Sequence, residues 1–156
     1  MQRIFGTCLF LKTCIVGAML AVAPLTFAAL GGDATSISRD QSHMRAQLRA
    51  GASNGYSVHE LQTEAGVNVR EYIAAGKVFA VAWDGPSLPD LSQLLGTYFP
   101  AFKQSMAARR SRGVRGPVTM QQDDLVVESR GTMRAFTGRA YVPSLLPPQV
   151  SVDEIQ

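Results

Sequence analysis

The sequence predicts an α+β domain over residues 56–142: a small antiparallel sheet of about five strands with one main helix packed on one face, in the order β-β-β-α-β-β. Apolar and polar residues alternate through 56–73, an apolar stripe with helical spacing runs through 91–102, and 14 glycines with 8 prolines disfavour an all-helical bundle. Tight turns within each group of strands favour antiparallel neighbours. With 156 residues, 46% of them hydrophobic, the chain fits one small domain.

Residues 1–28 have the layout of a secretory signal peptide. Positive charges at Arg3 and Lys12 precede an apolar run that ends at Leu25, and small residues stand three and one positions before Ala29. We expect export and cleavage before Ala29, which places the chain in the periplasm or outside the cell. The alternative is an uncleaved anchor, but the apolar run is shorter than the roughly 20 residues that a bilayer requires. After cleavage we do not expect an integral membrane protein.

Cleavage would remove several features of the whole sequence. Both cysteines, Cys8 and Cys14, lie in the removed segment, so disulfides, thiolate nucleophiles and cysteine metal ligands are not expected. Two of the 15 basic residues would be lost (Arg3 and Lys12) and none of the 12 acidic ones, so the formal charge falls from +3 to +1. The pI near 9.1 therefore overstates the basic character of the mature chain, and we expect no nucleic-acid partner.

Residues 29–55 are predicted to be a flexible N-terminal segment. Gly, Ser, Ala, Asp and Asn dominate there, and large apolar residues are few. Met44 and Leu48 lie four residues apart, which allows a short helix over 42–50 that Gly51 would end. The apolar stripe of this helix is too narrow to stabilise it alone.

The domain begins with three predicted strands. Residues 56–61 and 67–73 alternate between apolar and polar side chains around the turn signal Glu64-Ala65-Gly66, which predicts a hairpin. After a turn at Ala75-Gly76, residues 77–83 form a near-continuous apolar run. Such a run is typical of a strand covered on both faces, so we predict that it is the central strand.

One helix is predicted after the third strand. Ser87 is placed to cap it, and Asp90 is placed to complete a capping box near the positive end of the helix dipole. Pro100 should kink the helix or end it near Phe99, because proline inside a helix costs about 3 kcal/mol. The apolar residues share one helical face: Leu91, Leu94, Leu95, Tyr98, Phe99 and Phe102.

Two further strands are predicted after the helix. The first covers 118–129 as two merging pieces, and the second covers 133–142, with the turn at Arg130-Gly131 between them. Residues 143–156 contain three prolines and are predicted to form an extended C-terminal tail.

Short motifs follow one another along most of the expected mature chain. They are Ala29-Leu30-Gly31-Gly32, Val69-Arg70-Glu71-Tyr72, the run from Val78 to Leu91, Leu125 to Ser129 with Met133 to Phe136, and Ser151 to Ile155. In this order they resemble the bacterial exported family catalogued as domain of unknown function 2844. The resemblance implies a bacterial exported protein and implies no activity. The sequence departs from the family pattern at Ala75, where the pattern has an acidic residue before the glycine.

The residue types that catalysis requires are scarce. The expected mature chain has two histidines, His43 and His59, with no pair at metal-binding spacing, so we predict no metal site and no cofactor. No nucleophile motif or phosphate-binding glycine loop occurs, and no catalytic residue is assigned. The alternative is a small metal-independent hydrolase or lyase that uses His59 with Glu60, Glu71 or Glu128.

Two clusters are candidates for binding. Arginine and aromatic side chains on the predicted sheet form a possible binding surface for a glycan or a peptide, and the alternative is ordinary cross-strand packing. A possible basic docking loop follows the helix, and the alternative is a solvated loop whose cations favour the helix C-terminus. The sheet surface comprises Arg70, Tyr72, Trp83, Arg134 and Arg139, and the basic docking loop comprises Arg109, Arg110, Arg112 and Arg115.

The scarcity of catalytic residue types beside two candidate surfaces predicts an exported, non-enzymatic accessory or binding protein. Its expected partner is an envelope protein or an anionic surface component, which the cations of the docking loop would attract.

Overall fold

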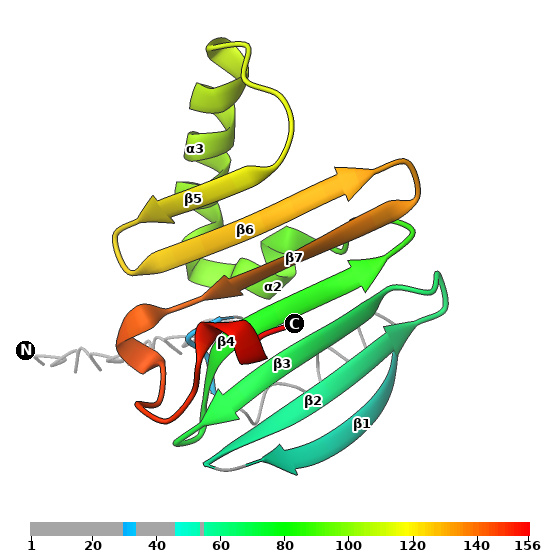
Figure 1. Ribbon diagram of the computed structural model, residues 1–156, viewed down its shortest axis with the longest axis vertical. Helices are drawn as coiled ribbons and strands as arrows, with labels where there is room; N and C mark the ends of the chain where they lie inside the picture. Colours follow the sequence, from blue (N-terminus) through cyan, green and yellow to red (C-terminus); the bar gives the residue numbers. More distant parts are fainter. Residues whose placement is uncertain (1–29, 34–45, 54) are drawn as a thin grey trace, which may run out of the picture.

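The chain is an α+β protein with one antiparallel sheet and one main helix, as the sequence predicts (Figure 1). The computed structural model describes residues 30–33, 46–53 and 55–156, and within these residues the sheet has seven strands rather than about five. The strands are β1 (Ala46–Ser53), β2 (Tyr56–Thr63), β3 (Asn68–Ala74), β4 (Lys77–Gly85), β5 (Val118–Gln122), β6 (Leu125–Thr132) and β7 (Ala135–Tyr141). The helices are α2 (Leu91–Leu95) and α3 (Phe99–Ser111), and the 3-10 turns are η2 (Gly96–Tyr98), η3 (Pro143–Leu145) and η4 (Val152–Glu154).

The strands lie side by side in the order β1-β2-β3-β4-β7-β6-β5, and every pair is antiparallel. Two meanders, β1 to β4 and β5 to β7, therefore meet where β4 pairs with β7 (Figure 1). Along the described chain the main elements follow one another as β-β-β-β-α-β-β-β, which corrects the predicted order β-β-β-α-β-β.

Strand β1 is the first reason for this correction. It occupies part of the segment 29–55 that we predicted to be flexible, and it overlaps the short helix predicted over 42–50. Its pairing with β2 runs from Ala46 opposite Thr63 to Ser53 opposite Tyr56. The main-chain hydrogen bonds to β2 stabilise a strand here, although the local sequence has no strand pattern and only a weak helical one.

The turn between β5 and β6 is the second reason. Asp123 has a φ of 52°, in the left-handed region that aspartate enters more readily than most residues. Gln122 pairs with Leu125, so Asp123 and Asp124 form a two-residue turn that reverses the chain. The strand predicted over 118–129 is therefore a hairpin.

Asp90, rather than Ser87, caps α2. The Asp90 carboxylate accepts hydrogen bonds from the main-chain N–H groups of Ser92 at 2.9 Å and Gln93 at 3.4 Å. It therefore satisfies two of the N–H groups that a helix start leaves without a partner inside the helix.

The helix is interrupted near Phe99, as predicted, and then resumes. The first part ends at Leu95, and the turn η2 follows. Pro100 stands in the first turn of α3, where its missing N–H would have no partner inside the helix. The proline therefore starts a second helix that continues to Ser111.

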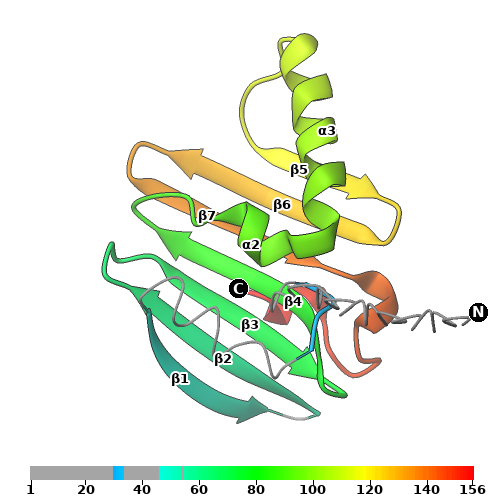
Figure 2. The ribbon, with the colours of Figure 1, turned by 180° about the vertical axis from the view of Figure 1, so that it is seen from behind.

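Both faces of the sheet bury apolar side chains. The helices cover one face of the sheet, here called the helix face (Figure 2). On this face, Trp83 of β4 is 1% exposed and belongs to the same core cluster as Leu94, Leu95 and Phe102 of the helices. On the opposite face, Phe79 of β4 is also buried. The central strand is therefore covered on both faces, as its apolar run predicts.

Residues 143–156 fold back over the sheet, whereas an extended tail was predicted. They contain the turns η3 and η4, and residues 150–156, here called the strap, lie on the face opposite the helices (Figure 1). Val150 and Ile155 of the strap are 6% and 1% exposed. Burial of these two side chains accounts for the difference, because apolar anchors hold a segment that prolines alone would leave extended.

The predicted signal peptide, residues 1–28, lies outside the described residues. Across the ranges that the structure describes, none of the helices has the length and apolar character needed to cross a membrane.

Candidate functional site

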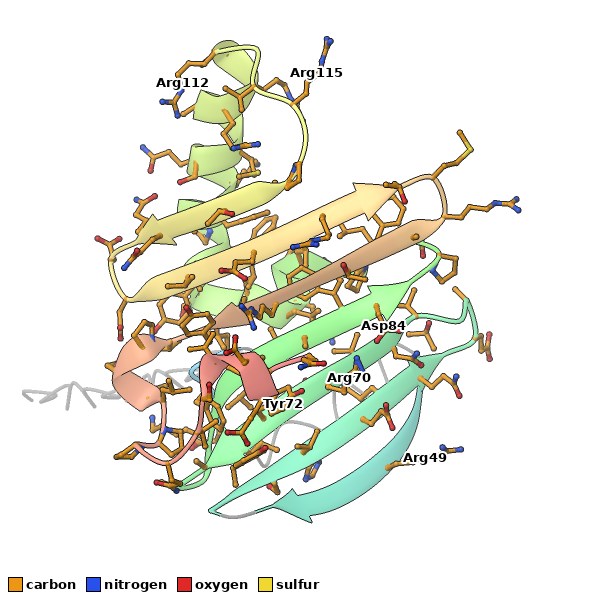
Figure 3. The ribbon with its side chains drawn as sticks, in the orientation of Figure 1. Arg49, Arg70, Tyr72, Asp84, Arg112 and Arg115 are labelled. Atoms are coloured by element: carbon orange, nitrogen blue, oxygen red, sulfur yellow. The ribbon has the colours of Figure 1, made fainter. Side chains whose placement is uncertain are left out.

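The structure places three of the five predicted sheet-surface residues together on the strap face and two elsewhere. Arg70 and Tyr72 lie on the strap face of β3 (Figure 3). Arg139 of β7 lies on the same face, where it bonds to the strap. Trp83 of β4 faces the helices, because it pairs with Val69, whose side chain points to the face opposite that of its chain neighbour Arg70. Arg134 is exposed in the turn between β6 and β7, with a φ of 63°.

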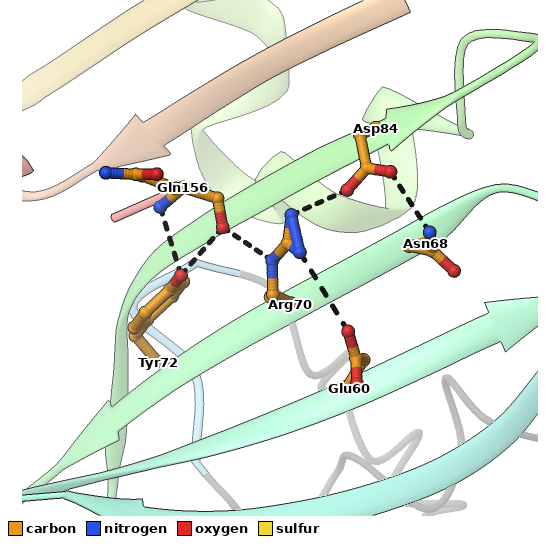
Figure 4. Close-up of polar contacts among 6 residues, drawn as sticks. All are labelled: Glu60, Asn68, Arg70, Tyr72, Asp84 and Gln156. Atoms are coloured by element: carbon orange, nitrogen blue, oxygen red, sulfur yellow. Dashed lines mark hydrogen bonds and ion pairs between the residues drawn. The ribbon is translucent and has the colours of Figure 1, made fainter. Parts of the chain in front are cut away.

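Arg70 is held by acidic residues and by the strap (Figure 4). Its Nη2 atom lies 2.6 Å from Oδ1 of Asp84, and its Nη1 atom lies 3.9 Å from Oε1 of Glu60. Its Nε–H donates to the main-chain oxygen of Gln156. Asn68 donates to the other carboxylate oxygen of Asp84 at 3.0 Å, which orients that carboxylate towards Arg70.

Tyr72 and Arg139 contact the same segment. The Tyr72 hydroxyl donates to the main-chain oxygen of Gln156 at 2.9 Å and accepts from its N–H at 3.1 Å. Arg139 donates through Nη1 to the carbonyl of Val152 at 2.7 Å and through Nε to Glu128 at 2.9 Å. Glu128 and Arg139 are also direct cross-strand partners. These polar side chains therefore bind the chain's own strap.

Burial raises the pKa of the Tyr72 phenol above its ordinary value, although the hydrogen bond to Gln156 and the charge of Arg70 oppose the shift. Below about pH 10 the phenol is neutral in both the folded and the unfolded chain. Above that pH the unfolded chain ionises first, so the free energy of unfolding falls as pH rises.

We expect Tyr72→Phe to reduce the loss of stability between about pH 9 and 11. The measurement is the free energy of unfolding in urea at each pH, followed by the fluorescence of Trp83, the only tryptophan of the chain. Burial and the charge of Asp124 also raise the pKa of Tyr98, so Tyr98→Phe should reduce the alkaline loss of stability in the same direction. An unchanged alkaline decline in Tyr72→Phe would contradict this role for Tyr72.

Within the predicted docking loop, two arginines hold the loop itself and two do not. Arg109 donates to the carbonyl of Pro117 at 2.8 Å, and Arg112 donates through Nε to the carbonyl of Ala108 at 3.1 Å. The side chains of Arg110 and Arg115 are exposed and make no hydrogen bond or ion pair with the residues that the structure describes. Arg115 extends away from the sheet at the free end of α3 (Figure 3).

A groove of about 620 Å³ lies between the end of α3, the loop 112–117 and the segment before α2. Two of its lining residues, Leu88 and Val114, are 46% and 45% exposed, and in the described chain Met133 is the only other large apolar residue with such exposure. The apolar lining is Leu88, Leu91, Phe102, Met106, Val114 and Val118, and the cations at its edge are Arg109, Arg110 and Arg115. The sequence predicts the cations but not the apolar lining, for which a single valine among arginines is the only local signal.

One of the three carboxylates proposed as partners of His59 shares its face of the sheet. Glu71 lies directly opposite His59 in the pairing of β2 with β3 and is fully buried. Glu60 and Glu128 belong to the opposite face. The Nδ1 atom of His59 is buried and has no hydrogen-bond partner in the described chain, and His59 does not line the groove.

Among the described residues, no group of three or more His, Cys, Asp or Glu side chains is arranged to hold a metal ion. No curated protein and no solved structure matches the chain. The family model described as "Protein of unknown function (DUF2844)" matches residues 26–155. The match confirms the resemblance found in the sequence motifs, and the chain belongs to this family.

Proposed function

We propose that the chain is an exported, non-enzymatic accessory protein that binds an acidic, amphipathic segment of another envelope protein in the groove at the end of α3. One observation carries the proposal: two exposed arginines, Arg110 and Arg115, edge a hollow that exposes Leu88 and Val114. The layout of residues 1–28 supports the export.

The chemistry of the groove indicates the character of the partner. Exposed apolar side chains gathered in one hollow are typical of a binding site, since leaving them in water costs free energy. Carboxylates would pair with Arg110 and Arg115 while aliphatic side chains fill the hollow between them. An amphipathic segment with acidic residues offers both groups.

A protein segment fits this groove better than a membrane surface. Binding to anionic lipid by charge alone usually takes a cluster of four to eight basic residues. Within the docking loop, the guanidinium groups of Arg109 and Arg112 already donate to main-chain carbonyls, which leaves those of Arg110 and Arg115 without a bond. A hollow also accepts a protruding side chain, which a flat lipid surface does not provide.

We expect the double variant Arg110→Ser/Arg115→Ser to bind an acidic amphipathic peptide at least about tenfold more weakly than the unchanged chain, at low salt. The probe is a fluorescent peptide of alternating Glu and Leu pairs, followed by anisotropy. The folded state should be unaffected, because substitutions at exposed sites change the free energy of unfolding by only about 0.5 kcal/mol.

The matched control is Arg130→Ser/Arg134→Ser, which removes the same charge at two exposed positions, one near the end of β6 and one in the turn that follows it. It should keep the affinity of the unchanged chain. Equal losses of affinity in the two double variants would mean that only the net charge of the chain matters, and would contradict the groove as the binding site. Binding to vesicles of anionic phospholipid without binding to the peptide would overturn the choice of partner.

A further inference from the structure

Among the residues that the structure describes, no hydrogen bond joins the main chain of the strap to the main chain of a strand. In the described chain, hydrogen bonds between main-chain groups join Glu154 to Ser151 and Ile155 to Val152 within the strap, and Val150 to Pro147 just before it. The strap is therefore outside the β ladder, and it can leave the sheet without breaking a strand pair.

Side chains of the sheet recognise the strap mainly through its backbone. Arg139 donates to the carbonyls of Val152 at 2.7 Å and Ile155 at 3.4 Å. Arg70 and Tyr72 donate to the main-chain oxygen of Gln156 (Figure 4). Such contacts fix the position of a peptide and are independent of its side chains, as in other modes of peptide recognition.

Apolar anchors add selectivity to this backbone recognition. The Ile155 and Val150 side chains are buried in the same cluster as Tyr72 and Phe79. On the acidic side of the strap, the Tyr56 hydroxyl donates to Glu154 at 3.1 Å. The sheet therefore has the parts of a peptide-binding site: carbonyl clamps, an aromatic floor and a pocket for an aliphatic side chain.

The connection between the strap and the last strand favours movement of the strap as a unit. The Val142 N–H still bonds to the carbonyl of Phe79, at 2.9 Å. The prolines at 143, 147 and 148 follow, and proline has no N–H with which to bind a strand. Residues 143–149 are thus a connector that carries the strap across the sheet outside the ladder.

We propose that this face is a peptide-binding site whose occupant, the chain's own strap, exchanges with the strap of a second copy of the chain. A second copy is the partner that these observations favour, because its strap would restore every contact described above. This exchange is independent of the groove at α3. The strap within one chain acts at an effective concentration in the millimolar range, so the exchanged dimer should be minor in dilute solution and increase with protein concentration.

The test uses the full chain with Ile155→Asp, which should vacate the site, and a fluorescent peptide of residues 143–156. We expect the peptide to bind this variant at least about 100-fold more tightly than it binds the unchanged chain, whose own strap competes. The same peptide carrying the Ile155→Asp change should not bind. Absence of binding to a folded variant would overturn the proposal.

A mixing experiment identifies the second copy as the partner. Ile155→Asp lacks a competent strap, and Arg70→Ala/Arg139→Ala lacks the carbonyl clamps, so each variant alone should stay monomeric in sedimentation. Mixed together, they should form a 1:1 complex. Peptide binding without this complex would overturn the second copy as the partner.

Hydrogen exchange of the unchanged chain keeps the proposal testable if Ile155→Asp fails to fold. Amide protons of Glu154 and Ile155 should exchange at least about 100-fold faster than those of Val81 and Trp83 in β4, because the strap opens separately. Equal rates for the strap and β4 would show that the strap leaves only on global unfolding, and would overturn the proposal.

Discussion

Replacing Gly138 with alanine is expected to destabilise the chain by about 3 kcal/mol, at the upper end of the usual cost of overpacking a core. A Cβ at this position would lie 2.4 Å from Cζ2 of Trp83 and 2.7 Å from the main-chain oxygen of Glu128. Trp83 is buried beneath the helices, and the Glu128 carbonyl belongs to the neighbouring strand, so neither group has room to move.

Urea unfolding followed by Trp83 fluorescence measures this loss of stability, and the fluorescent side chain is the one that the added Cβ would contact. The matched control is Gly51→Ala, also on a strand, where the nearest atom to an added Cβ is the Val58 oxygen at 4.0 Å. We expect that variant to be neutral within about 0.5 kcal/mol. A Gly138→Ala chain as stable as the Gly51→Ala chain would contradict the packing described for the pairing of β4 with β7.

Leu94→Ala is expected to lower the free energy of unfolding by about 3 kcal/mol, within the range of 2–5 kcal/mol usual for this substitution in a core. Leu94 is fully buried in the cluster that joins the helices to the sheet. The loss combines two contributions: the favourable burial of the deleted methyl groups, which is no longer gained, and the cost of the cavity left behind. Calorimetry or urea unfolding gives the value.

Leu88→Ala is the matched control, since it deletes the same atoms at a site that is 46% exposed. We expect it to change the free energy of unfolding by no more than about 0.5 kcal/mol and to weaken peptide binding in the groove. Equal destabilisation by the two substitutions would contradict the burial of Leu94. A full-strength peptide complex with Leu88→Ala would count against the apolar lining.

Elements with a strong local pattern could be predicted from the sequence. The apolar run of residues 77–83 identified the central strand β4, because a strand covered on both faces leaves little room for polar side chains. Helical spacing located α2 and α3, and Pro100 located their interruption. These signals depend on residues close together in the chain.

Elements that depend on distant partners could not be predicted in the same way. Strand β1 has few large apolar residues, and its pairing with β2 determines its conformation. The strap is anchored by Arg70 and Tyr72, which precede Gln156 by more than 80 residues. No local pattern indicates which side chains of the sheet meet a segment so far along the chain.

The candidate sites show the same division. Side-chain alternation within β3 puts Arg70 and Tyr72 on one face, and the sequence predicted them together. The prediction that Trp83 shares their surface is wrong, because a residue's face on a second strand depends on its cross-strand partner. Trp83 pairs with Val69, which lies on the other face. The groove could not be predicted from the sequence, since Leu88 and Val114 stand on either side of α2 and α3 in the chain and line one groove only in the folded structure.

The pairing of β4 with β7 has a consequence for the rate of folding. In the described sheet it is the one pairing between strands that are not consecutive in the chain, so it requires closure of the long connection through α2, α3, β5 and β6. Loop-closure entropy opposes this step, whereas hairpins within each meander close over short turns. The two meanders should therefore form first, each with an unpaired inner edge. Until they dock, these edges are the part of a newly made chain most exposed to aggregation.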